Sequence, residues 1–442
     1  MATADDSQAL IEATKDTLPD LPPEVPIPEY VRELCAKAKS AAGKLAALST
    51  AIKNQALTAM ADQLEARTEE ILAENEKDLE AFGADSTRQA MADRLRLTPE
   101  RIREMAQGVR EVVALPDPLG SMPKMWMRPN GMQVGRMRVP IGVIAMIYES
   151  RPNVTVDSAA LCLKSGNVCI LRGGSEAIHS NRMLASILAH AAEEAGVPPG
   201  TITFVDRPDR EVVPVLLTQD QAIDLVIPRG GASLMKIVAE HATIPVIKHD
   251  QGVCHMYVDH YADVEMAITL CLNAKVQRPS TCNATETVLV HQTAARAFLP
   301  RFVEQLHAAS VEVRGCAKTL QICPDLKPAA DEDFGCEFLS LVLAVKVVKS
   351  FEEALEHIAR YGSRHTESIV TQDYSRAMRF LKEVDASAVL VNASTRLNDG
   401  YQFGLGAEIG ISTSRIHARG PMGLDELTCS KFVVFGNGQI RE

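Results

Sequence analysis

The stretch Ile141-Gly-Val-Ile-Ala-Met-Ile-Tyr-Glu-Ser-Arg-Pro-Asn153 decides the fold class of this chain. It opens with an apolar run rich in β-branched residues, which predicts a buried strand. The polar residues and proline that follow predict a loop at the end of that strand. A helix must follow the loop if the chain is to return to the same sheet, and this unit is typical of α/β proteins.

The same alternation continues in both directions along the chain. Four more strands are expected up to residue 258, at Val168–Leu171, Thr201–Val205, Ile223–Ile227 and Ile244–Ile247. Helical segments lie between them at Asn181–Ala195 and Ser233–His241. This order predicts a parallel sheet with helices on both faces. A second alternating region, with strands near Val288, Leu341–Val348, Ser368–Thr371 and Ala388–Val391, predicts a second α/β domain and a cleft between the two.

Two regions outside this alternation differ in composition and in predicted secondary structure. Residues 30–115 are rich in helix-forming residues, and Thr98-Pro99 is typical of a helix start. Residues 125–139 read as two strands around the Asn130-Gly131 turn. A hairpin is marginal by itself, so this one is either a surface excursion or an arm that joins subunits.

The composition excludes several classes of function. The chain has 442 residues, 46% hydrophobic and 23% charged, with a net charge of -11. An acidic chain without a long basic run argues against nucleic acid or an anionic membrane as partner. No apolar run has the length of a membrane span, and the acidic first residues are unlike a secretory signal. The ten scattered cysteines favour a cytoplasmic protein with reduced thiols and no zinc site.

Three loops at predicted strand ends are candidates for an anionic ligand. They are Glu149–Asn153, Arg172-Gly173-Gly174-Ser175 and Pro228-Arg229-Gly230-Gly231-Ala232-Ser233. Ligands in open α/β sheets bind at the carboxyl ends of strands, where paired glycines and a helix start can accept a phosphate. The usual GxGxxG fingerprint does not follow any predicted strand, so purely structural glycine turns remain an equal alternative.

Cys282 is the best candidate for a nucleophile. It lies in the polar stretch Asn273-Ala-Lys-Val-Gln-Arg-Pro-Ser-Thr-Cys-Asn-Ala-Thr-Glu286, with Lys275 and Arg278 just upstream and a predicted strand just downstream. A thiol at such a loop edge can be reached by a substrate and ionised by nearby cations. The alternative is an inert buried cysteine that packs as a small apolar residue.

Several long motifs resemble the aldehyde dehydrogenase superfamily, and within it the enzymes that reduce γ-glutamyl phosphate. They are Val139–Val154, Leu171–Glu176, Asn273–Glu286, Arg364–Val370, Val391–Arg396, Phe403–Thr413 and His417–Pro421. The likeness runs from about residue 30 to the C-terminus. It implies an α/β fold of three parts: a Rossmann-like cofactor domain (30–123 and 140–253), a catalytic α/β domain (254–424) and a small β oligomerisation arm (124–139 and 425–442), after a flexible lead-in (1–29).

The resemblance also implies roles for particular residues. Cys282 is the expected nucleophile and Asn153 an oxyanion donor. The expected cofactor contacts are Arg172, Gly173, Gly174, Ser175, Arg229, Gly230, Gly231 and Glu337. Ser175 stands where NAD-preferring members often carry Glu, and with a nearby Arg it would tolerate a 2′-phosphate, so NADPH is the expected cofactor. Arg278, Lys275, Arg396, Arg415 and Arg419 are candidate cations for the substrate, with Arg278 preferred.

One departure from the superfamily bears on the reaction. Aldehyde-oxidising members carry a Glu that activates water to hydrolyse the thioester, and here the matching stretch is His249-Asp-Gln-Gly252. An enzyme that acts on an acyl phosphate should not hydrolyse its thioester, although His249 remains a candidate base. The expected substrate is therefore the small molecule L-glutamyl 5-phosphate, reduced by a homo-oligomer. An ordinary aldehyde dehydrogenase and an inactive binding protein of the same fold are the alternatives.

Overall fold

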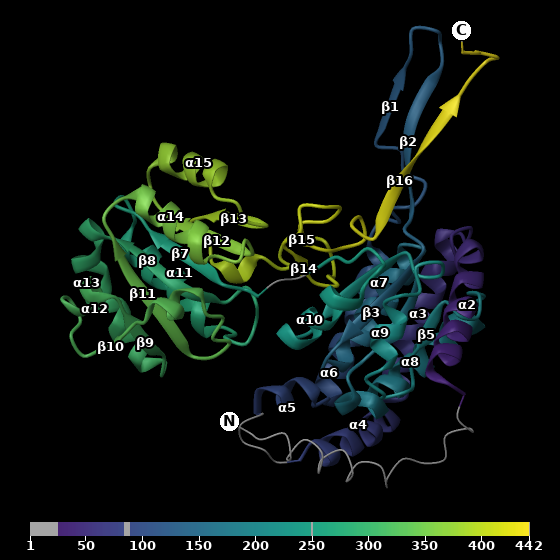
Figure 1. The fold of residues 1–442 in the computed structure, drawn as a ribbon, viewed down its shortest axis with the longest axis horizontal. Coiled ribbons are helices and arrows are strands. Elements are labelled where there is room, and N and C mark those ends of the chain that lie inside the picture. Colours follow the sequence, from purple (N-terminus) through teal and green to yellow (C-terminus); the bar gives the residue numbers. More distant parts are fainter. Residues whose placement is uncertain (1–24, 84–88, 249–250, 442) are drawn as a thin grey trace.

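The computed structural model describes residues 25–83, 89–248 and 251–441. Two α/β lobes lie side by side, and a narrow β arm projects from one of them (Figure 1). The lobe that carries the arm holds the helices from the N-terminal quarter of the chain. The other lobe holds most of the chain after residue 254. The two predicted α/β regions are thus separate bodies, each built on its own sheet.

The N-terminal helices cover one side of the first lobe. They are α2 (Ile27–Leu45), α3 (Thr50–Ala66), α4 (Thr68–Phe82), α5 (Gln89–Leu95) and α6 (Pro99–Ala114). The predicted helix start at Thr98 is confirmed, because the Thr98 side chain accepts a hydrogen bond from the Arg101 N–H at 3.2 Å. Pro99 occupies the first helical position, where its missing N–H costs nothing. A flexible lead-in was predicted for residues 1–29. Residues 1–24 of this segment lie outside the described residues.

The first sheet is parallel, with strand order β5-β4-β3-β6. Its strands are β3 (Val143–Tyr148), β4 (Val168–Arg172), β5 (Ile202–Phe204) and β6 (Leu225–Arg229). The helices of this lobe are α7 (Pro152–Lys164), η2 (Ser175–Ala177), α8 (Ile178–Glu194), α9 (Val212–Leu216) and α10 (Ala232–His241). The strand expected at Ile244–Ile247 forms only an isolated bridge between Val226 and Val246.

The second sheet has seven parallel strands in the order β10-β9-β11-β8-β7-β12-β13. The strands are β7 (Cys254–Val258), β8 (Thr285–His291), β9 (Glu312–Gly315), β10 (Lys327–Pro328), β11 (Val342–Val348), β12 (Thr366–Val370) and β13 (Ala388–Val391). The helices are α11 (Val264–Val276), α12 (Gln292–Ala308), α13 (Ala317–Leu320), η3 (Asp331–Gly335), α14 (Phe351–Tyr361), α15 (Tyr374–Glu383) and η4 (Thr395–Leu397). Separate apolar clusters include residues of α11 and α12 and of α14 and α15, so the sheet is buried on two faces.

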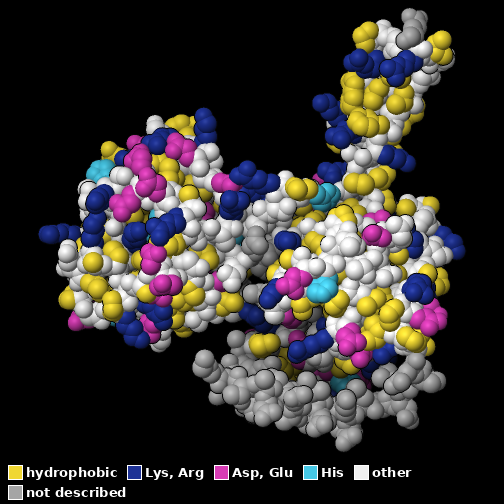
Figure 2. Space-filling view, in the orientation of Figure 1, with side chains coloured by type: hydrophobic (Ala, Val, Ile, Leu, Met, Phe, Trp, Pro, Cys, Tyr) yellow, Lys and Arg dark blue, Asp and Glu magenta, His cyan; other side chains and the backbone are white. Residues whose placement is uncertain are grey.

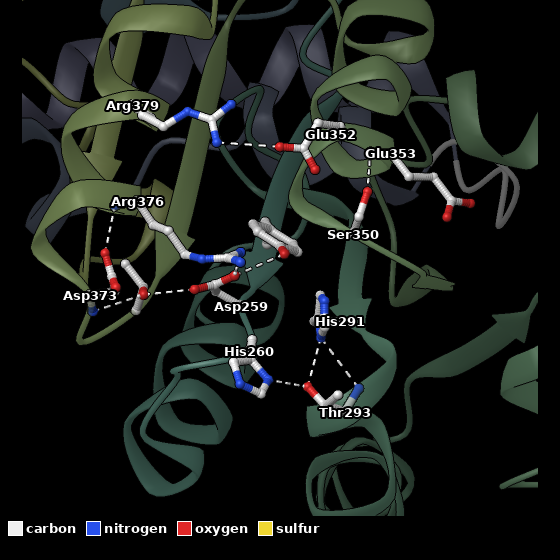
Figure 3. A network of polar contacts seen from close by, with 12 residues as sticks. Asp259, His260, His291, Thr293, Ser350, Glu352, Glu353, Asp373, Arg376 and Arg379 are labelled. Atoms are coloured by element: carbon white, nitrogen blue, oxygen red, sulfur yellow. Dashed lines mark hydrogen bonds and ion pairs between the residues drawn. The ribbon is translucent and has the colours of Figure 1, made fainter.

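The carboxyl ends of the second sheet are closed by their own polar contacts (Figure 3). Asp259, which follows β7 and is fully buried, accepts hydrogen bonds from the Tyr257 hydroxyl, the Thr371 hydroxyl and the Arg376 guanidinium at 2.8–2.9 Å. Thr293 contacts both His260 and His291. Both oxygens of Asp259 already accept hydrogen bonds from the protein, so this carboxylate is not available to a ligand. The loops at the opposite ends of these strands are the better candidates for a functional site.

The arm is a three-stranded antiparallel sheet of β1 (Lys124–Met127), β2 (Gln133–Pro140) and β16 (Thr428–Phe435). The predicted hairpin at the Asn130-Gly131 turn is confirmed, with Trp126 opposite Val134 and Gly131 at a φ of 84°. The segment before β16 differs from expectation. Residues 407–424, which include β14 (Ile411–Ser412) and β15 (Gly420–Pro421), were expected in the catalytic domain, but five of their apolar side chains join the core of the first lobe.

Candidate active site

Cys282 lies in a tight turn between α11 and β8, at the amino end of its strand. The Ala284 N–H donates to the Thr281 carbonyl at 3.0 Å, and the Thr281 N–H donates to the Arg278 carbonyl at 3.3 Å. The cysteine itself is half-buried. Its own backbone N–H has no acceptor among the described residues, so this donor is available to a bound substrate.

The backbone of Cys282 is held from behind by the start of β7. The Cys254 thiol donates to the Cys282 carbonyl oxygen at 3.2 Å. A Cβ built on Gly252 would lie 1.9 Å from that same oxygen, so only glycine fits there without moving the nucleophile. The Gly252 N–H donates to the Glu337 carboxylate at 2.8 Å. Glu337, expected to contact the cofactor ribose, therefore also fixes the loop behind Cys282.

The residue after Cys282 ties the turn to the loop that follows β13. The Asn283 amide donates to the Asn398 carbonyl at 3.0 Å and accepts a hydrogen bond from the Arg396 guanidinium. Arg396 donates in addition to the Gln277 side chain at 2.8 Å. Arg396 was predicted as a substrate contact, and these bonds place it directly beside the nucleophile.

Arginines from both lobes converge on the thiol. Arg94 of α5 donates to the Ser280 carbonyl at 2.8 Å, two residues from Cys282. Burial, together with the positive charges of Arg229, Arg94 and Arg278, lowers the pKa of Arg151 to about 9. The group comprises Arg94, Arg151, Arg229, Arg278 and Arg396, here called the arginine cluster.

The arginine cluster lacks counter-ions. None of its five members has a carboxylate within ion-pair distance among the residues that the structure describes. Elsewhere in the molecule arginines are commonly paired, as Arg110 is with Asp62 and Glu65. The lowered pKa of Arg151 follows first from burial, and the neighbouring cations, which have no counter-ion at ion-pair distance, lower it as well. Such a cluster is suited to bind an anion.

Opposing influences act on the Cys282 thiol. Burial raises its pKa above the ordinary value, and the Glu408 and Glu337 carboxylates raise it further. The positive charges of Arg229 and Arg151 act in the opposite direction. Arg229 packs against Gly410, where an added Cβ would lie 3.1 Å from its guanidinium. Arg229 was expected to contact the cofactor, and the structure places its charge at the nucleophile.

Asn153 lies at the start of α7, and its side chain is exposed. Its amide donates to the Asp157 carboxylate one turn later at 3.1 Å. Burial raises the pKa of Asp157 to about 6, while the Asn153 hydrogen bond and the Arg229 charge lower it. Asn153 and Cys282 therefore both lie close to Arg229, one from each lobe.

The loops at the carboxyl ends of β4 and β6 can hold an anionic cofactor. Arg172 is 9% exposed, donates to the Gly173 carbonyl at 3.0 Å and leaves its buried Nε without a partner among the described residues. The Gly231 N–H at the start of α10 donates to Glu149 at 2.9 Å. A Cβ on Gly173 would lie 2.1 Å from the Asn181 amide, so this glycine lets α8 pack against the loop.

Comparison with known proteins gives a consistent picture. The family model described as "Aldehyde dehydrogenase family" matches residues 27–333. The chain belongs to this family. It is 56% identical to a gamma-glutamyl phosphate reductase of Thermodesulfovibrio yellowstonii over 94% of this chain and 100% of that protein. The crystal structure of the gamma-glutamyl phosphate reductase of Thermotoga maritima superposes with a TM-score of 0.90 at 47% identity, covering 93% of this chain and 100% of that one.

As a member of the aldehyde dehydrogenase family, the chain has an α/β fold with a Rossmann-like half, as the sequence predicted. Three of the predicted substrate cations, Lys275, Arg415 and Arg419, are not in the arginine cluster. Lys275 is fully buried and pairs with Glu286 at 2.5 Å, and Arg415 pairs with Asp385 on an exposed loop together with Arg419. The geometry therefore gives no support to a substrate contact for Lys275, Arg415 or Arg419.

Sequence reasoning also missed residues of the site. Arg94 carries no local signal, since it lies in a short helix far from any strand. Arg151 was part of a quoted loop, and its place directly after a strand was a signal that could have marked it. His249 and Asp250 lie outside the described residues, so the predicted base is not placed.

None of the described helices has the length and apolar character needed to cross a membrane.

Proposed function

We propose that the chain reduces L-glutamyl 5-phosphate to L-glutamate 5-semialdehyde and phosphate, with NADPH as the reductant, in proline biosynthesis. The observation that carries this proposal is the arginine cluster around Cys282, which lacks counter-ions among the described residues. The substrate brings a phosphate and a carboxylate, and arginine binds both oxoanions bidentately. The gamma-glutamyl phosphate reductases at 56% and 47% identity support the same assignment.

Cys282 attacks the acyl carbon of the substrate as its thiolate. A carbon–sulfur bond forms, the bond to the phosphate oxygen breaks, and phosphate leaves with the bonding electrons. The positive charges of Arg229 and Arg151 favour the thiolate. The free N–H of Cys282 and the Asn153 amide stabilise the oxyanion, once the latter turns from Asp157.

The cofactor-binding half fits a nicotinamide dinucleotide by its own chemistry. Arg172 has a buried Nε without a partner among the described residues, and the α10 start can receive a pyrophosphate once the Glu149 carboxylate, which accepts the Gly231 N–H, turns away. When bound, NADPH would supply the hydride that reduces the thioester, and Cys282 would be released as its thiolate when the aldehyde forms. Glu337 keeps the loop at Gly252 in place throughout.

The preference for NADPH rests on the charge at the end of β4. Ser175 starts η2, and the positive charge of Arg210 acts on Arg172 nearby. The next residue, Glu176, accepts hydrogen bonds from the Ser150 N–H and hydroxyl at 2.7 and 2.6 Å. Its carboxylate is thus engaged by the protein, and Arg210, next to an Arg172 that is held by backbone carbonyls, supplies positive charge to meet a 2′-phosphate.

The lack of a water-activating glutamate supports the acyl phosphate as substrate. The position carries His249 in a stretch that ends at Gly252. Without that carboxylate a thioester on Cys282 persists until it is reduced, or until phosphate attacks it in the reverse direction. The chain is further proposed to work in the cytoplasm as a homo-oligomer joined by its arm.

The reverse reaction tests this proposal. The enzyme should reduce NADP with glutamate 5-semialdehyde only when phosphate or arsenate is present, and NAD should support a slower rate. Cys282→Ala should abolish turnover, because no thioester can form, while cofactor binding stays near normal by fluorescence titration. Oxidation of the aldehyde without phosphate would instead point to an ordinary aldehyde dehydrogenase, and turnover by the alanine variant would rule out the covalent route.

A further inference from the structure

One carboxylate stands out among the arginines around Cys282. Glu408 belongs to the segment that passes from the second lobe to the core of the first, and its side chain is half-buried. Its carboxylate accepts the Gly400 N–H, two residues from Asn398, whose carbonyl accepts the amide of Asn283 beside Cys282. The charge of Glu408 raises the pKa of the Cys282 thiol. A negative charge at this place works against the nucleophile. An enzyme that needs a thiolate therefore retains Glu408 for another purpose.

The structure holds Glu408 firmly in this position. Its Oε2 accepts the Gly400 N–H at 2.9 Å, and a Cβ on Gly400 would lie 2.9 Å from the Glu408 Cβ. Arg229 is close enough to lower the Glu408 pKa, against the burial that raises it. The second carboxylate oxygen has no hydrogen-bond partner among the described residues and does not belong to the buried unsatisfied atoms. That oxygen is left for a ligand.

The chemistry of the proposed substrate supplies a ligand for it. This step rests on the proposed function. L-Glutamyl 5-phosphate carries three charged groups, and the arginine cluster matches only the phosphate and the carboxylate. The third is the α-ammonium, which unpaired arginines repel. A partly buried carboxylate at the edge of the cluster would offset that repulsion and bind the ammonium by a charge-assisted hydrogen bond.

The other carboxylates near the thiol are less suited to this task. Glu337 accepts the Gly252 N–H at 2.8 Å and holds the loop behind Cys282. Asp157 accepts the Asn153 amide at 3.1 Å, and burial raises its pKa to about 6. Glu337 is expected at the cofactor and Asp157 contacts the expected oxyanion donor, so Glu408 is the carboxylate to which the proposed mechanism gives no other role. We infer that Glu408 binds the α-ammonium group of the substrate and makes the enzyme selective for the α-amino aldehyde over its deaminated analogue.

The test compares two aldehydes that differ only in the amine. Phosphate-dependent NADP reduction is measured with glutamate 5-semialdehyde and with 5-oxopentanoate, which has the same carbon chain and carboxylate. Glu408→Gln keeps an oxygen that can accept the Gly400 N–H but removes the charge. Its kcat/KM for the semialdehyde should fall by about 10- to 100-fold, the range of a lost charge-assisted hydrogen bond. The value for 5-oxopentanoate should stay within about threefold, because that aldehyde makes no such bond.

Two further variants frame the result. Glu426 accepts the Gly423 N–H at 3.0 Å in the same way, and Glu426→Gln should leave both aldehydes unchanged. Glu408→Asp keeps the charge but withdraws it by one methylene, so its selectivity should lie between those of the wild type and Glu408→Gln. If Glu408→Gln folds poorly, as judged by circular dichroism, the aspartate variant carries the comparison.

The outcomes separate this inference from the proposed function. An equal loss for both aldehydes in Glu408→Gln would overturn ammonium recognition and leave a structural role. A wild type that shows no phosphate-dependent turnover with either aldehyde would instead refute the proposed function. A measurement without substrate tests whether the Glu408 carboxylate lies near the thiol. The pH midpoint for alkylation of Cys282 by iodoacetamide should be lower in Glu408→Gln, because a negative charge that disfavours the thiolate is removed.

Discussion

The charge balance at Cys282 is set at the scale of single residues. Burial raises the pKa of the thiol, Arg229 and Arg151 lower it, and Glu408 and Glu337 raise it. The arginines therefore reduce the cost of ionising a thiol whose pKa burial raises. Arg229 is the most influential of these charges. The reactivity of Cys282 should therefore depend on a residue contributed by the other lobe.

Arg229→Gln tests that dependence. Loss of the positive charge disfavours the thiolate, so the Cys282 pKa should rise further above its ordinary value. The pH profile of alkylation by iodoacetamide, followed by mass spectrometry, should move to higher pH. Each pH unit of displacement lowers the thiolate fraction about tenfold below the midpoint. Arg182→Gln is the control, because Arg182 donates to the Asp206 carbonyl and does not act on the thiol. An unchanged profile in Arg229→Gln would contradict the electrostatic account.

At the scale of elements, a buried ion pair joins α11 to β8 beside the catalytic turn. Lys275 and Glu286 are both fully buried, with 2.5 Å between Nζ and Oε2. The other Glu286 oxygen accepts the Leu339 N–H at 3.1 Å, which ties down the loop that carries Glu337. Burial raises the pKa of Glu286 to about 7, against the charge of Lys275. The pair thus supports the site without touching substrate.

Lys275→Met should be strongly destabilising. Removal of one partner leaves a buried carboxylate without compensation, which costs about 3–5 kcal/mol in the free energy of unfolding. Urea denaturation followed by circular dichroism measures the loss. Adding Glu286→Gln should restore part of it, because the remaining buried group is then neutral. The matched control is Arg301→Met, which breaks an exposed pair with Glu265 at the same 2.5 Å and should cost far less, because water screens the exposed charges. Equal costs in the two single variants would contradict this interpretation.

These elements also indicate what the sequence can and cannot predict. The strand at Val168–Leu171 and the turn at Gly131 were predictable, because apolar runs and glycine conformations are local properties. The polar turn of Cys282 before a strand was predictable, while its role as the nucleophile came from the resemblance to the aldehyde dehydrogenase superfamily and stays a prediction. Lys275 was predicted to contact the substrate, but it pairs with Glu286, eleven residues away on β8. The sequence alone does not show that this strand packs against α11. Arg94 and the core membership of Ala407 depend on how lobes meet, which no local pattern encodes.

At the scale of the whole molecule, the arm is the feature whose apolar side chains and sheet edges remain exposed in a single chain. Apolar side chains gather along it beside lysines and arginines (Figure 2). Met127 is 66% exposed and Phe432 63% exposed, although both lie in a regular sheet. Apolar patches of this kind mark contact surfaces in soluble proteins. The sheet order β1-β2-β16 also leaves open edges, which a second copy of the chain can cover.

Phe432→Asp should therefore weaken self-association. A carboxylate buried at a subunit contact without a partner is costly, so the oligomer should dissociate toward smaller species at micromolar concentration. Sedimentation velocity measures the change, and circular dichroism should show an intact fold, because Phe432 lies outside the three hydrophobic cores. The control is Tyr374→Asp, the same kind of change at an aromatic residue that is 77% exposed on the catalytic lobe.

The arm starts from the lobe that contributes Arg94 and Arg229 to the site around Cys282. If Phe432→Asp loses assembly but keeps full activity, this site works within one chain. An oligomer that survives Phe432→Asp unchanged would remove the arm from the interface.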